Sequence, residues 1–355
     1  MVVSLPQPLL WVTEYLQSGV TIPAHPLALD ANRRFDERSQ RALTRYYHAA
    51  GAGGLAVGVH TTQFAIRNPE HNLLRPVLEL AAETARVEDE RAGRSTILVA
   101  GILGNTQQAV AEAKLARDLG YHLGLLSLAA LPGATDEELI DHARAVAAEI
   151  PLFGFYLQPS VGGRILSRSF WREFCAIENV MAIKVAPFNR YGTLDVLRGV
   201  VESGRAEEVA LYTGNDDTII YDLLTDYQSI EGICLKFVGG LLGHWAVWTK
   251  GAVELLAKVR EWKGSKVIPR EALQTALHVT EMNGAIFDAA HNYAGCIPGI
   301  HYVLYKQGLI ESINTLDPSE LLSPGQREEI ERVIAAYPHL VDDDFVRDHL
   351  EEWRS

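Results

Sequence analysis

Short apolar runs recur along the first two thirds of the chain, and a stretch with helical spacing follows most of them. Eight of these runs are predicted strands, at residues 20–23, 54–59, 97–102, 122–128, 152–159, 180–187, 209–214 and 232–238. They show little alternation with polar residues, which is typical of a parallel sheet covered on both faces. After residue 238 only helical patterns follow, at about 253–262, 271–292, 299–306 and 324–337.

Eight strands that alternate with helices predict an α/β fold, a (β/α)8 TIM barrel with a C-terminal helical extension. An open, doubly wound parallel sheet is the alternative. The pattern divides the chain into an N-terminal extra helix within 1–18, a barrel over 19–250 and the extension over 251–355. Thr135 with Glu138 three residues later predicts a capping box at the start of one helix.

One lysine stands out because it interrupts an apolar strand. Lys184 lies in the sequence Val-Met-Ala-Ile-Lys-Val-Ala-Pro over residues 180–187. Burial disfavours the ammonium form, so such an amine can serve as a neutral nucleophile that condenses with a carbonyl to form a Schiff base. A strand-end lysine that is ion-paired or reaches solvent is the alternative, and Lys236 in the eighth predicted strand is a rival amine.

A tyrosine on the preceding strand strengthens the case for Lys184. Tyr156 lies 28 residues before it, one strand–helix–strand step, and consecutive parallel strands bring their carboxyl ends together. A phenol beside the lysine could carry protons during imine chemistry.

In a barrel, the residues at the carboxyl ends of the strands form the active site. Besides Tyr156 and Lys184, these ends supply hydroxyl groups, an imidazole and glycine-containing loops. The residues are His60, Thr61, Thr62, Gly214, Asn215, Asp216, Asp217, Gly239 and Gly240. His60 faces a substrate or is a hydrogen-bonded structural residue, and the threonines could instead cap a helix. Asp216 and Asp217 are predicted to cap the next helix.

Composition narrows the partners and the compartment. The chain has 355 residues and a formal charge of −13, which argues against nucleic acid and anionic membrane surfaces as partners. The three cysteines are far apart and suit a reducing cytoplasm. No secretory signal is expected, because the first 17 residues lack a basic start and contain Glu14.

The chain resembles the dihydrodipicolinate synthase and N-acetylneuraminate lyase family of Schiff-base aldolases from about Gly19 to the C-terminal helices. The residues that carry the resemblance are Thr61-Thr62, Phe155-Tyr156-Leu157-Gln158-Pro159, Ile183-Lys184, Gly214-Asn215-Asp216 and 306–310. Tyr-x-x-Pro followed at the same interval by a strand lysine is the specific part.

The resemblance implies a small-molecule substrate, pyruvate or a related 2-oxo acid, and no cofactor or metal ion. Lys184 would form the Schiff base, and Tyr156 would shuttle protons with the help of a hydroxyl from Thr61 or Thr62. Backbone amides near those threonines would hold the carboxylate, and Gly214 and Gly239 would leave room for substrate. A homo-oligomer, a tetramer or dimer, is also implied.

Departures from the family pattern argue against lysine biosynthesis, so authentic dihydrodipicolinate synthase is not expected. The acidic Gly-Glu after the threonine pair is Gln63-Phe64 here, and the tyrosine expected at the end of strand four is absent from 127–132. The position of the family's carboxylate-binding arginine is Val161, with Arg164 nearby. A lyase, aldolase or dehydratase is predicted; a non-catalytic 2-oxo-acid-binding barrel and a metal-dependent barrel enzyme are the alternatives.

Overall fold

The computed structural model describes residues 5–230 and 232–355, which form two compact units. Of the described residues, 5–20, 97–230 and 232–241 form the first unit, and Thr21–Thr96 and Leu242–Ser355 form the second. Eight parallel strands alternate with helices along the chain. Two of these strands lie in the second unit, and the other six are described with the first. The predicted (β/α)8 fold class is therefore confirmed.

The first unit is built on a parallel sheet with strands in chain order. These are β3 (Ile97–Ile102), β4 (Leu123–Leu126), β5 (Leu152–Leu157), β6 (Val180–Ala186), β7 (Ala210–Thr213) and β10 (Phe237–Leu242). Every residue of β6 is buried, as a strand covered on both faces requires. Consecutive parallel neighbours place the ends of β5, β6 and β7 side by side.

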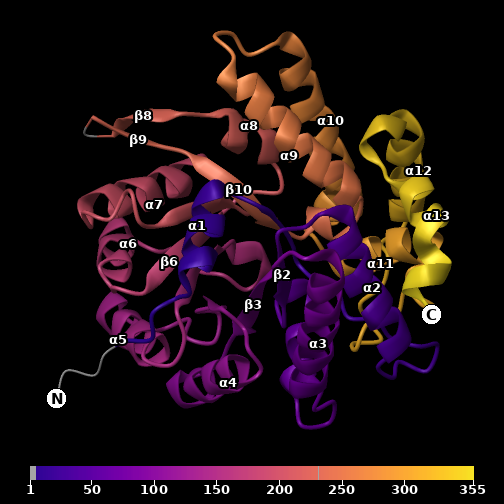
Figure 1. Ribbon diagram of the computed structural model, residues 1–355, viewed down its shortest axis with the longest axis horizontal. Coiled ribbons are helices and arrows are strands. Elements are labelled where there is room, and N and C mark those ends of the chain that lie inside the picture. The colour runs from indigo at the N-terminus through magenta and orange to yellow at the C-terminus, as the bar shows by residue number, and fades with distance from the viewer. Residues whose placement is uncertain (1–4, 231) are drawn as a thin grey trace. The chain divides into compact units, whose positions relative to one another are not determined.

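Helices lie between these strands along the chain: α4 (Thr106–Asp118), α5 (Asp136–Ala147), α6 (Arg168–Cys175), α7 (Arg190–Glu202) and α8 (Ile219–Leu224). A further helix, α1 (Leu10–Ser18), precedes all of them. Figure 1 shows α5, α6 and α7 next to one another along the strands. The predicted capping box is confirmed: the Thr135 hydroxyl accepts from the Glu138 amide, and the Glu138 carboxylate accepts from the Thr135 amide.

The eighth parallel strand exists, but the bounds predicted for it, 232–238, are wrong. The structure instead has a two-stranded antiparallel hairpin, β8 (Tyr227–Ile230) and β9 (Ile233–Leu235), which lies close to α7 (Figure 1). The strand that pairs with β7 is β10, so Gly239 and Gly240 lie inside it and not after it. Glycine suits this position because a Cβ on Gly239 would lie 2.4 Å from the Val20 carbonyl oxygen.

The second unit contains two short strands and most of the C-terminal helices. Its strands β1 (Thr21–Pro23) and β2 (Gly54–Val57) are linked by a parallel bridge between Ala24 and Ala56. Its helices are α2 (Glu37–Ala50), α3 (Leu74–Ala92), α9 (Thr249–Gly264), α10 (Arg270–Ile286), α11 (Cys296–Lys306), α12 (Gln326–Ala336) and α13 (Asp343–Trp353). Four of the five after β10 match predicted helices.

The last helix, α13, was not predicted, although its sequence carries a signal for it. Val346 and Trp353 are buried seven residues apart on one face, and Asp343 and Asp344 occupy the first turn, where carboxylates favour a helix start.

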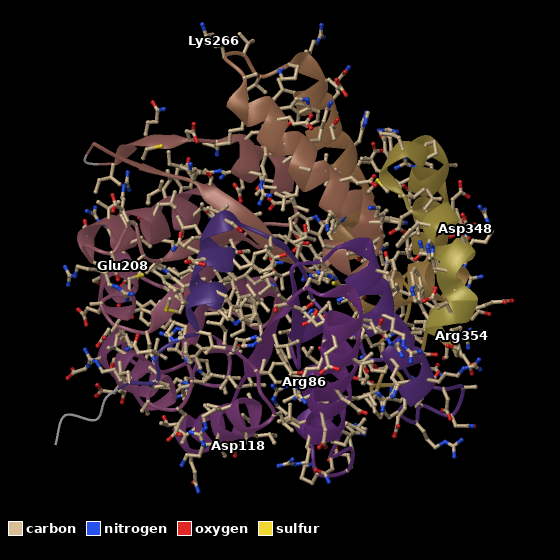
Figure 2. The ribbon with its side chains drawn as sticks, viewed as in Figure 1. Arg86, Asp118, Glu208, Lys266, Asp348 and Arg354 are labelled. Carbon is tan, nitrogen blue, oxygen red and sulfur yellow. The ribbon has the colours of Figure 1, made fainter. Side chains whose placement is uncertain are left out.

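Charged side chains cover the outside of each unit. Asp118 of the first unit and Lys266 of the second point away from the ribbon in Figure 2. Across the described residues, no helix combines the length and the apolar character needed to cross a membrane.

Candidate active site

Lys184 is a buried amine in the middle of the first unit's sheet. Its side chain is 7 % exposed, and its Nζ lies over the Phe155 ring, 4.6 Å from the ring centroid. An ammonium group is attracted to an aromatic face, whereas burial penalises its charge. The lysine side chain is therefore buried and lies at a defined place, as a positioned nucleophile requires.

The strand register decides which side chains share the face of Lys184. Its register partners are Phe155 on β5 and Tyr212 on β7, whereas Tyr156 is paired with Val185. Directly opposed residues point to the same face, and successive residues point to opposite faces. Phe155 and Tyr212 therefore lie on the lysine face, and Tyr156 lies on the other.

A one-residue irregularity between β5 and β6 produces this register. Leu152 pairs with Val180, 28 residues later, but Phe153 already pairs with Ala182, 29 residues later. The pairing skips Met181, as in a β-bulge. Without this step, the interval of 28 would set Tyr156 directly opposite Lys184. The structure does not bring the two predicted catalytic residues onto one face.

The contacts of Tyr156 agree with its place on the helix-facing side of the sheet. Its ring lies 5.4 Å from the ring of Trp171 in α6, and its hydroxyl accepts a hydrogen bond of 3.4 Å from the Leu166 amide. Burial raises the pKa of the Tyr156 phenol, and the bond from Leu166 opposes that rise. Its role in proton transfer stays a prediction.

Gly214 gives the lysine side chain its space. A Cβ on Gly214 would lie 2.7 Å from Cε and 2.9 Å from Cγ of Lys184, closer than side-chain atoms approach one another. The sequence predicted that this glycine leaves room at the site, and the structure shows that the lysine arm occupies that room.

Asn215 is buried and its side chain is committed to internal hydrogen bonds. Its Oδ1 accepts from the Phe188 amide at 3.0 Å, and its Nδ2 contacts Thr193 Oγ1 at 3.2 Å and Asp222 Oδ2 at 2.9 Å. Both amide hydrogens and the carbonyl oxygen are thereby used. These bonds indicate that Asn215 shapes the loop, a role different from the substrate contact predicted for it.

The predicted caps of the next helix are wrong. Helix α8 begins after Thr218, which is its N-cap residue and makes no capping bond with its own side chain. Asp216 and Asp217 lie in the turn before this point, where burial raises the pKa of Asp217.

In the second unit, the threonine pair forms a tight turn, η1 (His60–Thr62), after β2. The Thr61 hydroxyl donates to the Ala24 carbonyl at 2.8 Å, and the Thr62 hydroxyl donates to the His25 carbonyl at 2.7 Å. Thr62 Oγ1 also accepts from the Gly58 amide at 2.9 Å. Both hydroxyl protons are thus engaged with backbone carbonyls, and the catalytic role predicted for Thr62 stays a prediction.

His60 opens this turn and is partly exposed. Its ring lies 5.9 Å from the ring of Phe64. Substrate contact by His60 stays a prediction.

Comparisons with known proteins add a second line of evidence. No family model matches the chain. A 4-hydroxy-tetrahydrodipicolinate synthase of Aromatoleum aromaticum is 26% identical over 302 residues, which cover 83% of this chain and 89% of that protein. The enzyme of the same name from Nitratidesulfovibrio vulgaris is 27% identical over 192 residues, 53% of this chain and 61% of that protein, so this match spans less than two thirds of the relative.

Solved structures share the fold across almost the whole chain. Dihydrodipicolinate synthase from Oceanobacillus iheyensis has a TM-score of 0.72 at 18% identity and covers 92% of this chain and 99% of its own. N-acetylneuraminate lyase from Fusobacterium nucleatum has a TM-score of 0.70 at 17% identity and covers 90% and 99%. Over most of its length, the chain is thus similar in sequence to 4-hydroxy-tetrahydrodipicolinate synthases and similar in fold to the dihydrodipicolinate synthase and N-acetylneuraminate lyase family. The named relatives and structural neighbours are lyases.

Arg164 is close in sequence to Val161, where the family resemblance expects an arginine, but its guanidinium binds backbone carbonyls. Its Nη1 donates to the Leu131 carbonyl at 2.6 Å and its Nη2 donates to the Ala134 carbonyl at 2.9 Å. Arg164 therefore ties the loop after β5 to the loop after β4.

Gln63 was noted in the sequence only as a departure from the family pattern, and the structure gives it a distinct environment. It is 5 % exposed and has a positive φ of 67°, unusual for a residue other than glycine. Its Oε1 accepts from the Leu316 amide at 2.6 Å, and within 5–230 and 232–355 its buried Nε2 has no hydrogen-bond partner. Buried donors are normally satisfied, so this amide is available to a ligand or a water molecule.

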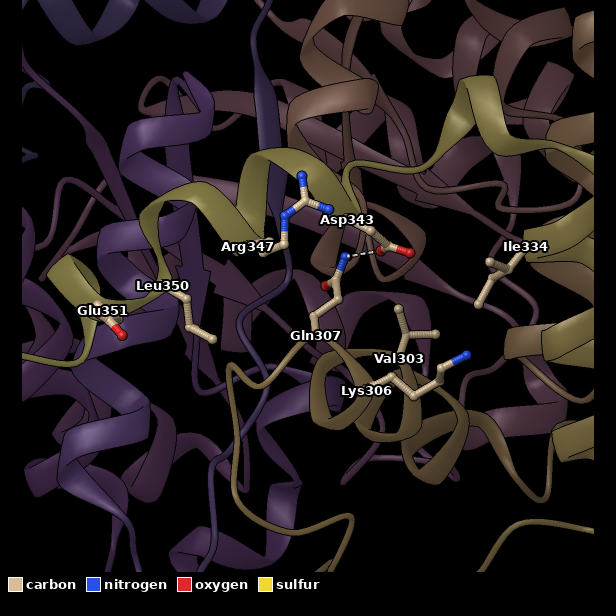
Figure 3. A pocket seen from close by; sticks show the side chains of 8 residues that line it. All are labelled: Val303, Lys306, Gln307, Ile334, Asp343, Arg347, Leu350 and Glu351. Atoms are coloured by element: carbon tan, nitrogen blue, oxygen red, sulfur yellow. Dashed lines mark hydrogen bonds between the residues drawn. The ribbon is translucent and has the colours of Figure 1, made fainter.

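The described residues contain no group of three His, Cys, Asp or Glu side chains placed to hold a metal ion. The second unit has a pocket of about 420 Å³ between α11, α12 and α13, shown in Figure 3. Gln307 donates to Asp343 across it at 2.8 Å, and apolar Val303 and Ile334 share its lining with Lys306. None of its lining residues belongs to the predicted site.

Proposed function

We propose that this enzyme is a Schiff-base-forming lyase or aldolase, or a dehydratase, that acts on pyruvate or a related 2-oxo acid. The observation that carries the proposal is the buried Lys184, held over Phe155, with a glycine beside its arm. Two structural neighbours support the choice of substrate. A dihydrodipicolinate synthase from Acinetobacter baumannii and YagE, a prophage protein from E. coli, have each been solved with pyruvate.

The proposed chemistry starts with the neutral amine of Lys184. Its lone pair attacks the keto carbon of the 2-oxo acid, a C–N bond forms, and the resulting carbinolamine loses water to give an iminium. The iminium accepts electrons, so the adjacent carbon can lose a proton and become an enamine. In a condensation, the enamine carbon forms a bond to the carbonyl carbon of an aldehyde. In a cleavage, the same C–C bond breaks. In a dehydration, a neighbouring hydroxyl group is eliminated as water.

The second substrate of this enzyme differs from that of authentic dihydrodipicolinate synthase. Two observations support this part of the proposal: Val161 stands where the resemblance expects an arginine, and the guanidinium of Arg164 is bound to two backbone carbonyls. A carboxylate on the second substrate would need another partner. We therefore propose an aldehyde or sugar-acid fragment that is recognised differently.

We further propose a cytoplasmic homo-oligomer, a tetramer or a dimer. Cys175 and Cys296 are buried and Cys234 is exposed, and none of the three is joined in a disulfide among the described residues, which suits a reducing compartment. On α10, Leu273 and Leu277 lie one turn apart and are 51 % and 61 % exposed, an apolar surface that a second copy could cover. Sedimentation showing only monomers at micromolar concentration would count against the assembly.

Sodium borohydride trapping tests the enzymatic proposal. With pyruvate present, we expect the mass to increase by one reduced pyruvate per chain, and peptide mapping should locate the adduct at Lys184. Lys184→Met retains the apolar stem and should abolish the adduct. The exposed Lys236 is the matched control, and Lys236→Met should react like the wild-type protein. If the folded wild-type protein forms no adduct with any 2-oxo acid, the Schiff-base mechanism is wrong, and metal analysis then tests a metal-dependent reaction.

A further inference from the structure

A buried carboxylate near the Lys184 strand collects hydrogen bonds from four side chains. Asp222 of α8 is 0 % exposed. Its Oδ2 accepts from the Thr213 hydroxyl at 2.7 Å and from Asn215 Nδ2 at 2.9 Å. Its Oδ1 accepts from the Tyr227 hydroxyl at 3.3 Å and forms an ion pair with Arg190.

These four donors come from separate segments of the first unit. Thr213 ends β7, Asn215 lies in the loop that follows it, and Tyr227 begins the hairpin. Arg190 is the first residue of α7, which follows the lysine strand β6. Asp222 therefore joins the connections that leave β6 and β7.

Asn215 extends this network to a strained point of the first connection. Its Oδ1 accepts from the amide of Phe188, whose φ is 49°. A bulky residue adopts this left-handed conformation only when its surroundings enforce it. The network thus holds the backbone just beyond the lysine strand in a conformation that it would not adopt by itself.

The same network fixes the position of Gly214 against Lys184. Gly214 lies between Thr213 and Asn215, both of which donate to Asp222. Its Cα is so close to the lysine arm that an added Cβ would stand 2.7 Å from Lys184 Cε. A small displacement of this turn would therefore change the space in which the amine sits.

Removing the carboxylate would disrupt the whole network. Hydrogen bonds to an ionised group are stronger than neutral ones, and buried donors that lose their acceptor are destabilising. Burial lowers the pKa of Arg190, but the charge and hydrogen bond of Asp222 raise it above its usual value. Burial and the Asp222 charge raise the pKa of Tyr227. In both residues the Asp222 charge favours the protonated form, which is the form that donates to it.

We infer that Asp222 is a positioning residue for the Lys184 amine, acting through Thr213, Asn215 and the Gly214 turn. The effect of this positioning on turnover rests on the proposed function. The effect on the position of the Lys184 amine does not. Arg190 and Tyr227 hold the carboxylate from the other side and make the hairpin part of the same network.

Asp222→Asn tests the inference because it keeps the side-chain shape and removes the charge. At saturating pyruvate, we expect the rate of borohydride-trapped adduct formation to fall by roughly 10- to 100-fold. A displacement of the reacting amine by about 1 Å is enough for a rate loss of this size. Asp226→Asn removes an exposed carboxylate from the same segment and should react at the wild-type rate.

A purely structural role predicts a different result. The variant would lose stability, but its folded fraction would react at the wild-type rate and with the wild-type pH profile. That result would overturn the inference. Tyr227→Phe removes only one donor to Asp222, so this variant should fold normally and lower the trapping rate less than Asp222→Asn does. If Asp222→Asn does not fold, an unchanged trapping rate in Tyr227→Phe overturns the inference.

A second reaction keeps this inference separate from the proposed function. Reductive methylation with formaldehyde and cyanoborohydride, followed by peptide mapping, measures the reactivity of Lys184 without a 2-oxo acid, with Lys236 as the internal reference. We expect Asp222→Asn to change the methylation rate of Lys184 and not that of Lys236. Equal Lys184 rates in wild type and variant would overturn the inference, whereas failure of the wild type to trap any 2-oxo acid would overturn only the proposed function.

Discussion

Phe155 is the register partner of Lys184, and its ring centroid lies 4.6 Å from the lysine Nζ. Tyr156, the next residue, is consequently turned to the opposite face of the sheet, against Trp171. The skipped residue Met181 is the cause, since one extra residue in a strand reverses the faces of the pairing that follows. This relationship distinguishes two possible roles of Tyr156: proton transfer at the lysine, or packing against the helices on the other face of the sheet.

For Tyr156→Phe, the register predicts a small effect. The hydroxyl accepts one weak hydrogen bond, so we expect adduct formation and turnover to fall less than about tenfold. A general acid or base would instead cost roughly 10²–10⁴-fold. Single-turnover rates measured with pyruvate decide between the two, and a loss in the larger range would show that the phenol reaches the reacting atoms.

Gly214→Ala should damage the site directly. The new Cβ would overlap with Lys184 Cε, and overpacking of this kind costs about 1–3 kcal/mol. We expect the protein to fold, with trapping by pyruvate slowed at least tenfold because the amine is displaced. Gly133→Ala is the matched control, because nothing lies within 4 Å of the added methyl group. Equal trapping rates in both variants would contradict the close approach of Gly214.

Acid should destabilise the protein through its buried histidines. Burial lowers the pKa values of His25, His244 and His301 to about 4, although backbone contacts oppose the shift at His25 and His301. An unfolded histidine takes up its proton near pH 6.5, so the stabilising contribution is full above that value and is lost as the pH falls from 6.5 towards 4.

Urea unfolding should therefore show a free energy that is constant between pH 7 and 8 and falls by a few kcal/mol towards pH 5. His301→Gln should flatten this slope relative to the wild type. A slope equal to that of the wild type in this variant would show that His301 does not contribute.

Much of the fold was predictable from local patterns in the sequence. Buried parallel strands need apolar residues on both faces, so strands such as 97–102 were visible as continuous runs. The capping box at Thr135 and Glu138 was also predictable, because both partners lie within one helical turn. Lys184 was recognisable because a charged residue inside such a run is costly.

Tertiary structure decided what depends on pairing between distant segments. The skipped Met181 set the face of Tyr156, although the interval between the tyrosine and the lysine was known. The hairpin before β10 displaced the eighth strand, and the Asp222 network engaged Asn215. Apolar runs identify strands because burial is a local requirement, but register and hydrogen-bond partners follow from the packing of segments far apart in the chain.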